Sequence, residues 1–299
     1  MAAIENSQRL KRWREYLLFV ALVGPNLALI LVFTYRPILQ NLVYSTLDWQ
    51  LGNDTARRVG LANYEEFFRT GEAVAVFRTT AVFTIATVGL TLALGLLVAL
   101  GLDRKVRGAG LAQGTVFSPY VLSGVGVGLA WQFIFNPTVG ALGAILRAVG
   151  LQSPEWFNTP SLSLAMVVIV YVWKNLGYAA VIYLAALQAV PAEVLEAAAI
   201  DGASRAGRFF KVTLPLLSPT TFFLVLTTTL NSLQAFDLLR AMTPLGRGTT
   251  TLMYDVYLQS FGGYNRAGYA AAISTILLAV LLVLTLVQLL VLERRVHYR

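Results

Sequence analysis

The sequence of 299 residues contains no cysteine and a single histidine, His297. Disulfide frameworks, thiol nucleophiles and metal sites built from Cys and His are therefore excluded. Charged residues are also scarce, at 13% of the chain, whereas hydrophobic residues make up 57%. A soluble domain of this length would need more polar side chains to cover its surface, so the composition predicts a protein that lies in a membrane.

The sequence also lacks the motifs of a nucleotide-binding or hydrolytic site. None of its four lysines follows a glycine or precedes Ser or Thr, so it has no P-loop. Gly124, Gly126 and Gly128 follow no predicted strand, and we expect them to allow close packing of helices rather than to hold a phosphate. Gly-x-Ser-x-Gly, paired carboxylates and clustered metal ligands are absent as well. The chain is predicted to be no enzyme and to bind no cofactor itself.

Long apolar runs, in contrast, are abundant. A helix that crosses a bilayer needs about 20 mainly apolar residues, because every backbone amide must be hydrogen-bonded within its own helix. Six runs meet this requirement: residues 16–35, 74–102, 111–135, 161–188, 216–239 and 269–292. The first is longer than the core of a signal peptide, so we expect a retained anchor. The sequence predicts an all-α polytopic membrane protein with six transmembrane helices in one domain, residues 16–292, between short tails at 1–15 and 293–299.

The distribution of Lys and Arg predicts the orientation of these helices. With six spans both termini lie on the same side of the membrane, and that side carries an excess of Lys and Arg over the opposite side. By the positive-inside rule the termini are then cytoplasmic. We interpret the net charge of +8 as a result of the membrane topology and of contact with anionic lipid headgroups, and not as a sign of nucleic-acid binding.

Residues 190–219, between the fourth and fifth runs, are too polar to span the membrane and too apolar for a loose linker. Pro191 suits the first position of a helix, and Gly202 supplies the left-handed residue that ends it. Ser204 can cap a second short helix that ends at Leu214 and Pro215, where the fifth span starts. The sequence predicts a compact helical hairpin that is rigidly joined to a transmembrane helix and is therefore suited to transmitting a movement to that helix.

The same stretch carries a family resemblance. The string Glu196-Ala-Ala-Ala-Ile-Asp-Gly-Ala203, followed by Phe210, Leu214-Pro215 and Pro219, resembles the EAA loop of binding-protein-dependent ABC importer permeases. The likeness extends over nearly the whole chain, including Trp131 with Phe135-Asn136-Pro137, Phe222-Phe223, and Thr249 to Leu252 with Tyr254. Within the family it is similar to the first of the two permease subunits of sugar-type importers, in particular those for glycerol-3-phosphate.

The resemblance implies an ABC importer type I permease fold in the bacterial cytoplasmic membrane. It also implies the partners: a second, homologous permease subunit, two ATPase subunits that bind ATP and Mg, and an extracytoplasmic solute-binding protein. The loop would dock into a cleft of the nucleotide-binding subunit. The coupling residues implied are Glu196, Ala197, Ala198, Asp201, Gly202, Ala203, Phe210, Leu214 and Pro215.

Arg78 lies near the outer end of the second run, where its side chain can reach the membrane surface. Two other charged residues, Lys174 and Asp237, also fall inside the apolar runs. A charge at bilayer depth costs at least about 2.5 kcal/mol, so both are expected to face the bundle interior or water. They form either a buried pair that holds two helices together or part of the substrate pathway. The resemblance to maltose-type permeases places that pathway at Trp173, Lys174, Asn175, Leu176, Gly177, Leu233, Gln234 and Asp237.

The sequence leaves two alternatives for the transported solute. The lysine ammonium fits a phosphate group, as in glycerol-3-phosphate or a glycerophosphodiester, whereas a Trp platform with amides fits a neutral sugar of the trehalose or maltose kind. A secondary transporter is a rival interpretation, but it would need inverted halves, and the first half holds no second copy of residues 196–219. A membrane scaffold without transport activity is the third alternative.

Overall fold

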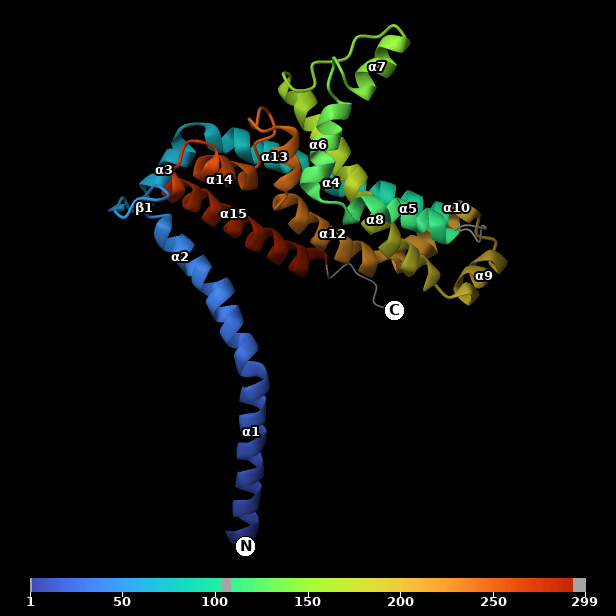
Figure 1. Ribbon diagram of the computed structural model, residues 1–299. Helices are drawn as coiled ribbons and strands as arrows, with labels where there is room; N and C mark the ends of the chain where they lie inside the picture. The colour runs from blue at the N-terminus through green and yellow to red at the C-terminus, as the bar shows by residue number, and fades with distance from the viewer. Residues whose placement is uncertain (1, 104–108, 293–299) are drawn as a thin grey trace.

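The computed structural model describes residues 2–103 and 109–292, and this part of the chain is mostly helical. Long helices lie side by side in one body, from which a single N-terminal helix extends away (Figure 1). The predicted C-terminal tail, residues 293–299, lies outside the described residues, and so do the basic residues Arg104, Lys105 and Arg107 between the second and third runs.

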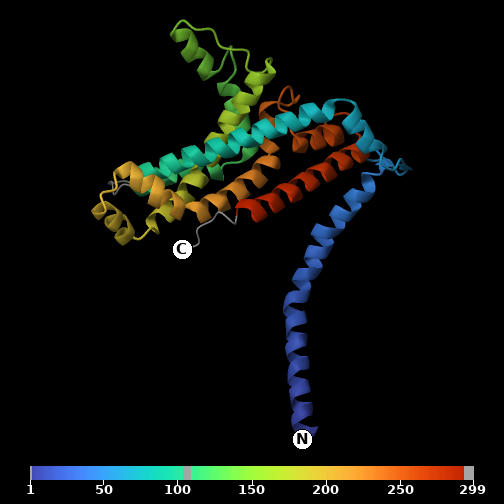
Figure 2. The same ribbon diagram turned by 180° about the vertical axis from the view of Figure 1, so that it is seen from behind.

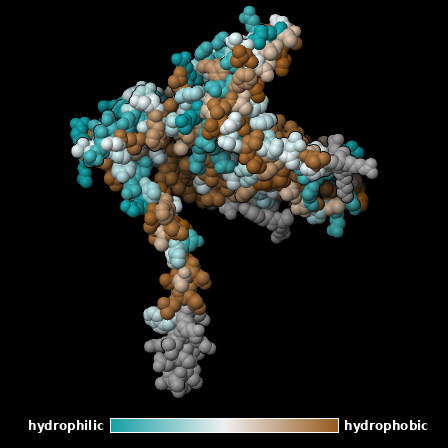
Figure 3. All heavy atoms as spheres, viewed as in Figure 1, coloured by the Kyte–Doolittle hydropathy of each residue, from teal (hydrophilic) through white to brown (hydrophobic). Residues whose placement is uncertain are grey.

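The N-terminal arm is one continuous helical rod. Helix α1 (Ala2–Ile30) begins inside the predicted tail and passes through a π-helical turn, η1 (Leu31–Tyr35), into α2 (Arg36–Tyr44). Pro37 lacks an amide hydrogen and its ring crowds the carbonyl of Phe33, which accounts for the wider turn there. Helix α2 packs on the body, where the Asn41 amide donates to the Ala271 carbonyl (3.2 Å). From Tyr16 to Tyr44 the arm exposes many apolar side chains (Figure 3), as expected for a helix covered by lipid or by another subunit.

Helices α4 (Glu72–Leu102) and α8 (Pro160–Gln188) lie against each other at the centre of the body. A side chain at Gly95 would come within 2.7 Å of the Ala179 Cβ, so this glycine permits their close approach. Helix α5 (Ala109–Val121) packs on α8 and α12 (Ser218–Leu233) packs on α4. Helix α15 (Ala267–Val287), which ends in a π-helical turn, η3 (Gln288–Leu292), packs against α2.

The prediction of unbroken helices is wrong for the third and fifth runs. In the third, α5 is followed by α6 (Gly124–Ile134) at an angle of 96°, because Ser123 is extended. In the fifth, α12 ends at Leu233 and a separate helix, α13 (Asp237–Met242), begins at Asp237. Close packing is confirmed at Gly128, where a Cβ would lie 2.5 Å from that of Ala241 on α13, and at Gly124. At Gly126 only Ser123 is near, so there the prediction of close packing is wrong.

Helices long and apolar enough to cross a membrane number four in the described ranges: Tyr16–Tyr44, Glu72–Leu102, Pro160–Gln188 and Ala267–Leu290. Two bent pairs, Gly110–Val121 with Gly124–Ile134 and Arg205–Leu216 with Ser218–Leu233, raise the number to six if each pair is one crossing. The described chain therefore has four to six candidate spans.

Opposite ends of α4 carry two different structures (Figures 1 and 2). At one end lies what we call the polar cap, residues 45–72 and 252–269. It contains α3 (Ala62–Arg69), α14 (Leu252–Phe261) and a strand pair that the sequence did not predict, β1 (Leu47–Asp48) with β2 (Arg57–Arg58). At the other end lies the hairpin, residues 191–217, with α9 (Ala192–Ile200), α10 (Arg205–Arg208), η2 (Phe209–Thr213) and α11 (Leu214–Leu216). Helix α7 (Ala141–Ala148) extends from the body beyond α6.

Candidate functional site

The turn of the hairpin is held by its own backbone. Gly202 has φ +82°, the left-handed conformation predicted for it. The Gly202 amide donates to the Ala199 carbonyl (3.1 Å) and the Ala203 amide to that of Ala198 (3.0 Å), which is the Schellman arrangement that ends a helix. Because the turn needs a positive φ, another residue at position 202 would strain it.

The second helix of the hairpin starts as predicted and ends later. The Ser204 hydroxyl accepts a hydrogen bond from the Gly207 amide (3.1 Å), so the predicted cap is confirmed. Helical structure then continues through Leu214 and Pro215 to Leu216, and the chain bends by 62° at Leu217. The predicted end at Leu214 and Pro215 is therefore one residue early, and the π-helical turn η2 accommodates the Pro215 ring. Pro191 caps α9 instead of occupying its first position.

The hairpin presents apolar side chains that nothing in the described chain covers. Ile200 is 87% exposed and Phe210 is 65% exposed. Of the predicted coupling residues, Glu196, Ala197, Asp201, Gly202 and Phe210 are exposed, whereas Ala198, Ala203, Leu214 and Pro215 are half-buried. The exposed set gathers at the tip, on α9, the turn and the start of η2, where another protein surface can reach it.

The predicted pathway residues divide into two groups. Four of them line a cavity of about 400 Å³ between α8 and the break after α12, namely Lys174, Asn175, Gln234 and Asp237. The other four do not line it. Trp173 packs edge-on against Trp131, Leu176 is half-buried, Gly177 and Leu233 are buried, and a Cβ at Gly177 would overlap the Val116 carbonyl of α5. The sequence prediction missed further lining residues, among them Tyr171, Phe236 and Met253.

Lys174 is held by the bend in the third run. Its ammonium donates to the Tyr120 carbonyl (2.9 Å), which the end of α5 leaves without a helical partner. The same ammonium lies 5.5 Å from the centre of the Tyr120 ring. The ion pairs among the described residues are Arg57–Asp48 and Arg266–Glu66, so Lys174 and Asp237 share the cavity without forming the buried pair considered above. An ammonium has three donors, and two remain for a solute.

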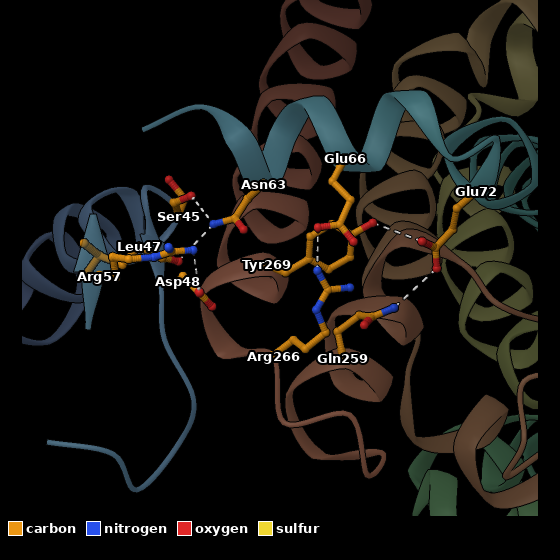
Figure 4. A network of polar contacts seen from close by, with 10 residues as sticks. All are labelled: Ser45, Leu47, Asp48, Arg57, Asn63, Glu66, Glu72, Gln259, Arg266 and Tyr269. Atoms are coloured by element: carbon orange, nitrogen blue, oxygen red, sulfur yellow. Dashed lines mark hydrogen bonds and ion pairs between the residues drawn. The ribbon is translucent and has the colours of Figure 1, made fainter. Parts of the chain in front are cut away.

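Polar side chains in the polar cap join helices that are far apart in sequence (Figure 4). Glu72 at the start of α4 accepts from the Tyr269 hydroxyl (3.0 Å) and from the Gln259 amide (3.3 Å). Arg266 pairs with Glu66 of α3 (2.6 Å) and lies 4.2 Å above the Tyr269 ring. These contacts tie α3, α4, α14 and α15 together.

Beside this network Asp255 is 2% exposed, and its Oδ2 has no hydrogen-bond partner among the described atoms. Burial, reinforced by the charge of Glu72, raises the pKa of Asp255 from 3.8 to about 6, although the Gln259 hydrogen bond opposes the shift. The described residues contain no group of three or more His, Asp or Glu side chains that could hold a metal ion.

Known proteins resemble the chain over nearly its whole length. The family described as "Binding-protein-dependent transport system inner membrane component" matches residues 1–298. The sn-glycerol-3-phosphate transport system permease protein UgpA of Agrobacterium fabrum is 35% identical over 280 residues, 93% of this chain and 95% of that protein. The protein of the same description from Pectobacterium atrosepticum is 32% identical over 292 residues, 96% of each chain.

Solved structures agree on the fold. A chain of a bacterial ABC transporter involved in import of the acidic polysaccharide alginate superposes with a TM-score of 0.83 at 21% identity, covering 96% of this chain and 99% of that one. A second structure, a bacterial alginate ABC transporter in complex with alginate pentasaccharide-bound periplasmic protein, gives a TM-score of 0.80 at 21% identity, covering 92% of this chain and 93% of that one. At this identity the likeness carries the fold alone.

Proposed function

Because the chain belongs to the family of binding-protein-dependent transport system inner membrane components, we propose that it forms half of the pathway by which a bacterial importer takes up sn-glycerol-3-phosphate or glycerophosphodiesters. As a membrane component of an ABC importer the chain is a permease subunit and not an enzyme. Family membership also decides against the secondary transporter and the scaffold.

The proposed solute rests on one observation in the structure, the position of Lys174 in the cavity beside Asn175, Gln234 and Asp237. A cation with two unused donors in a site of low dielectric suits a phosphate oxygen. Trp173, which would have supplied a platform for a sugar ring, packs on Trp131 and does not line the cavity. The names of the relatives at 32–35% identity point to the same solute.

For the topology we propose six crossings within residues 16–292. The bent pair of α5 and α6 forms the third, and α12 with α13 forms the fifth, because Arg205–Leu216 belongs to the hairpin. Both termini and the hairpin then lie in the cytoplasm and the polar cap lies outside. This orientation agrees with the excess of Lys and Arg on the side of the termini. It puts the cap where a solute-binding protein would approach and the hairpin where ATP is available.

For coupling we propose that the exposed tip of the hairpin docks into one of two ATPase subunits, which bind ATP and Mg. The residues at the contact are Glu196, Ala197, Ala198, Asp201, Gly202, Ala203, Phe210, Leu214 and Pro215. The exposed apolar side chains of Ile200 and Phe210 support a protein partner at this place. A second, homologous permease completes the pathway, and an extracytoplasmic binding protein delivers the solute.

The test is uptake by the assembled transporter in proteoliposomes with its binding protein. Lys174→Met should lower uptake of labelled glycerol-3-phosphate at least about tenfold, since it removes a charged hydrogen-bond donor. Lys174→Arg, which keeps the charge, should retain part of the activity. Unchanged uptake by Lys174→Met, or a wild type that transports only a neutral sugar such as trehalose, would exclude the phosphate ester.

A further inference from the structure

A second cavity, of about 680 Å³, meets the first at Asp237, which lines both. Its walls come from α6, α13, α14 and the residues that follow α14. It is larger than the cavity at Lys174, and Tyr257, Leu258, Phe261, Gly262 and Tyr264 of the polar cap line it. A solute coming from the cap can therefore pass through it first.

Arg240 supplies the positive charge of this second cavity. It follows Asp237 by three residues on α13, so both side chains lie on the same face of that helix. The guanidinium lies 4.8 Å above the centre of the Tyr257 ring, which holds its plane in place. Among the described residues no carboxylate lies within 4.0 Å of it and no side chain or carbonyl accepts a hydrogen bond from it. Its planar set of donors is free for a ligand.

The remaining walls suit a small polyol with one anionic end. Tyr257 and Phe261 offer aromatic surface to the carbon skeleton, while Gln132 and Asp237 offer polar groups to hydroxyls. Since guanidinium and phosphate can form two parallel hydrogen bonds, Arg240 is the group that would fix the orientation of such a ligand. The Asp237 carboxylate between the two cations weakens anion binding at each, as a pathway needs sites that also release.

We propose that the second cavity is an outer subsite, in which Arg240 binds the phosphate of the solute before the solute moves on to Lys174. This inference rests on the proposed function for the identity of the solute. It adds a second anion site, a residue that sets specificity, and an order of contact along the pathway.

The direct test is protection of Arg240 from phenylglyoxal, which modifies accessible arginines, in the assembled transporter. Peptide mapping should show that millimolar glycerol-3-phosphate slows modification of Arg240 several-fold and that glycerol does not. Modification of Arg58, which is exposed in the polar cap, serves as the internal control and should not change. Equal modification of Arg240 with and without glycerol-3-phosphate overturns the subsite. An Arg240 that is unreactive throughout is covered by another subunit, which overturns it as well.

Uptake measurements separate this inference from the proposed function. Arg240→Gln should raise the KM for glycerol-3-phosphate about tenfold, and Arg240→Lys should raise it less, because the charge stays while the two-bond geometry is lost. Arg58→Gln should leave KM unchanged. If the wild type takes up glycerol-3-phosphate and Arg240→Gln has the same KM as the wild type, the outer subsite is disproved and the proposed function is supported. If glycerol-3-phosphate protects Arg240 but the wild type does not take it up, the proposed function is disproved and the anion site is supported.

Discussion

The polar cap and the hairpin lie at opposite ends of the same long helix and are held together in opposite ways. In the cap, side chains pair across helices distant in sequence, as in Tyr269 with Glu72 and Arg266 with Glu66. In the hairpin, the turn is held by bonds between neighbours, at Gly202 and at Ser204. The cap buries the polar side chains of Asn63, Asp255 and Gln259, whereas the hairpin exposes the apolar side chains of Ile200 and Phe210.

This difference indicates which end is complete without a partner. Long-range polar contacts fix the positions of several helices at once, so the cap needs no other protein to keep its shape. Local bonds fix only the form of the hairpin and leave its apolar tip uncovered, as expected for a surface that binds another subunit. Substitutions in the cap should therefore change stability, and substitutions at the tip of the hairpin should change transport.

The largest effect is expected from Ile200→Asp combined with Phe210→Asp. Two charges in an apolar interface should lower uptake, and the ATP hydrolysis that solute stimulates, at least about hundredfold. Because both side chains are exposed, the free energy of unfolding should change by less than about 0.5 kcal/mol. The matched control is Ile200→Val with Phe210→Leu, which keeps the surface apolar and should transport normally. Full activity of the doubly charged variant would remove the distinction between the two ends.

In the polar cap, Gly268→Ala should cost about 3 kcal/mol of stability. A Cβ at Gly268 would overlap the Leu47 carbonyl, and the Gly268 amide already donates to the Trp49 carbonyl (3.0 Å), so the backbone has little room to shift. Thermal unfolding in detergent measures the loss. Gly89→Ala is the control, since a Cβ there meets nothing within 4 Å, and it should be neutral or stabilising by up to about 1 kcal/mol. Equal melting temperatures for the two variants would mean that the cap is not tightly packed at Gly268.

A smaller effect in the cap depends on pH. Below about pH 4 Asp255 is protonated in the folded and the unfolded chain; between pH 4 and about 6 the unfolded chain releases this proton while the folded chain keeps it. Stability should therefore fall as the pH rises through this window, by on the order of 2 to 3 kcal/mol. Asp255→Asn still accepts the Gln259 hydrogen bond and should flatten this decline, so it should be more stable than wild type at pH 8. Parallel melting curves against pH for both proteins would contradict the role of Asp255.

The sequence predicted the hairpin better than it predicted the cavity. Gly202 and Ser204 act through backbone geometry of their immediate neighbours, so their roles could be inferred from residue type and spacing. The break after Leu233 has no Gly or Pro to mark it, and it results from packing of α13 on Gly124 and Gly128 of α6. Such contacts depend on the whole fold.

The same dependence on the whole fold explains why only some of the predicted pathway residues line the cavity. Asn175 and Lys174 could be singled out as polar groups in an apolar run, but residue type alone does not tell which face of α8 meets the cavity. Trp173, one position away, lies on Trp131 instead. Arg240 falls just outside the predicted fifth run, residues 216–239, so the sequence did not assign it to the pathway. Its spacing of three residues from Asp237 in an otherwise apolar stretch was a signal that the two could share a face.

The measurement that tests the account most directly uses the absence of cysteine from the chain. Ala203→Cys puts one thiol in the turn of the hairpin, and Asn53→Cys puts one on the exposed surface of the polar cap. With a short thiol-specific photo-crosslinker in the assembled transporter, the account predicts a crosslink from position 203 to the ATPase subunit and none from position 53. If position 203 forms no crosslink to that subunit and stays open to a bulky maleimide in the full complex, the hairpin is not where the ATPase acts.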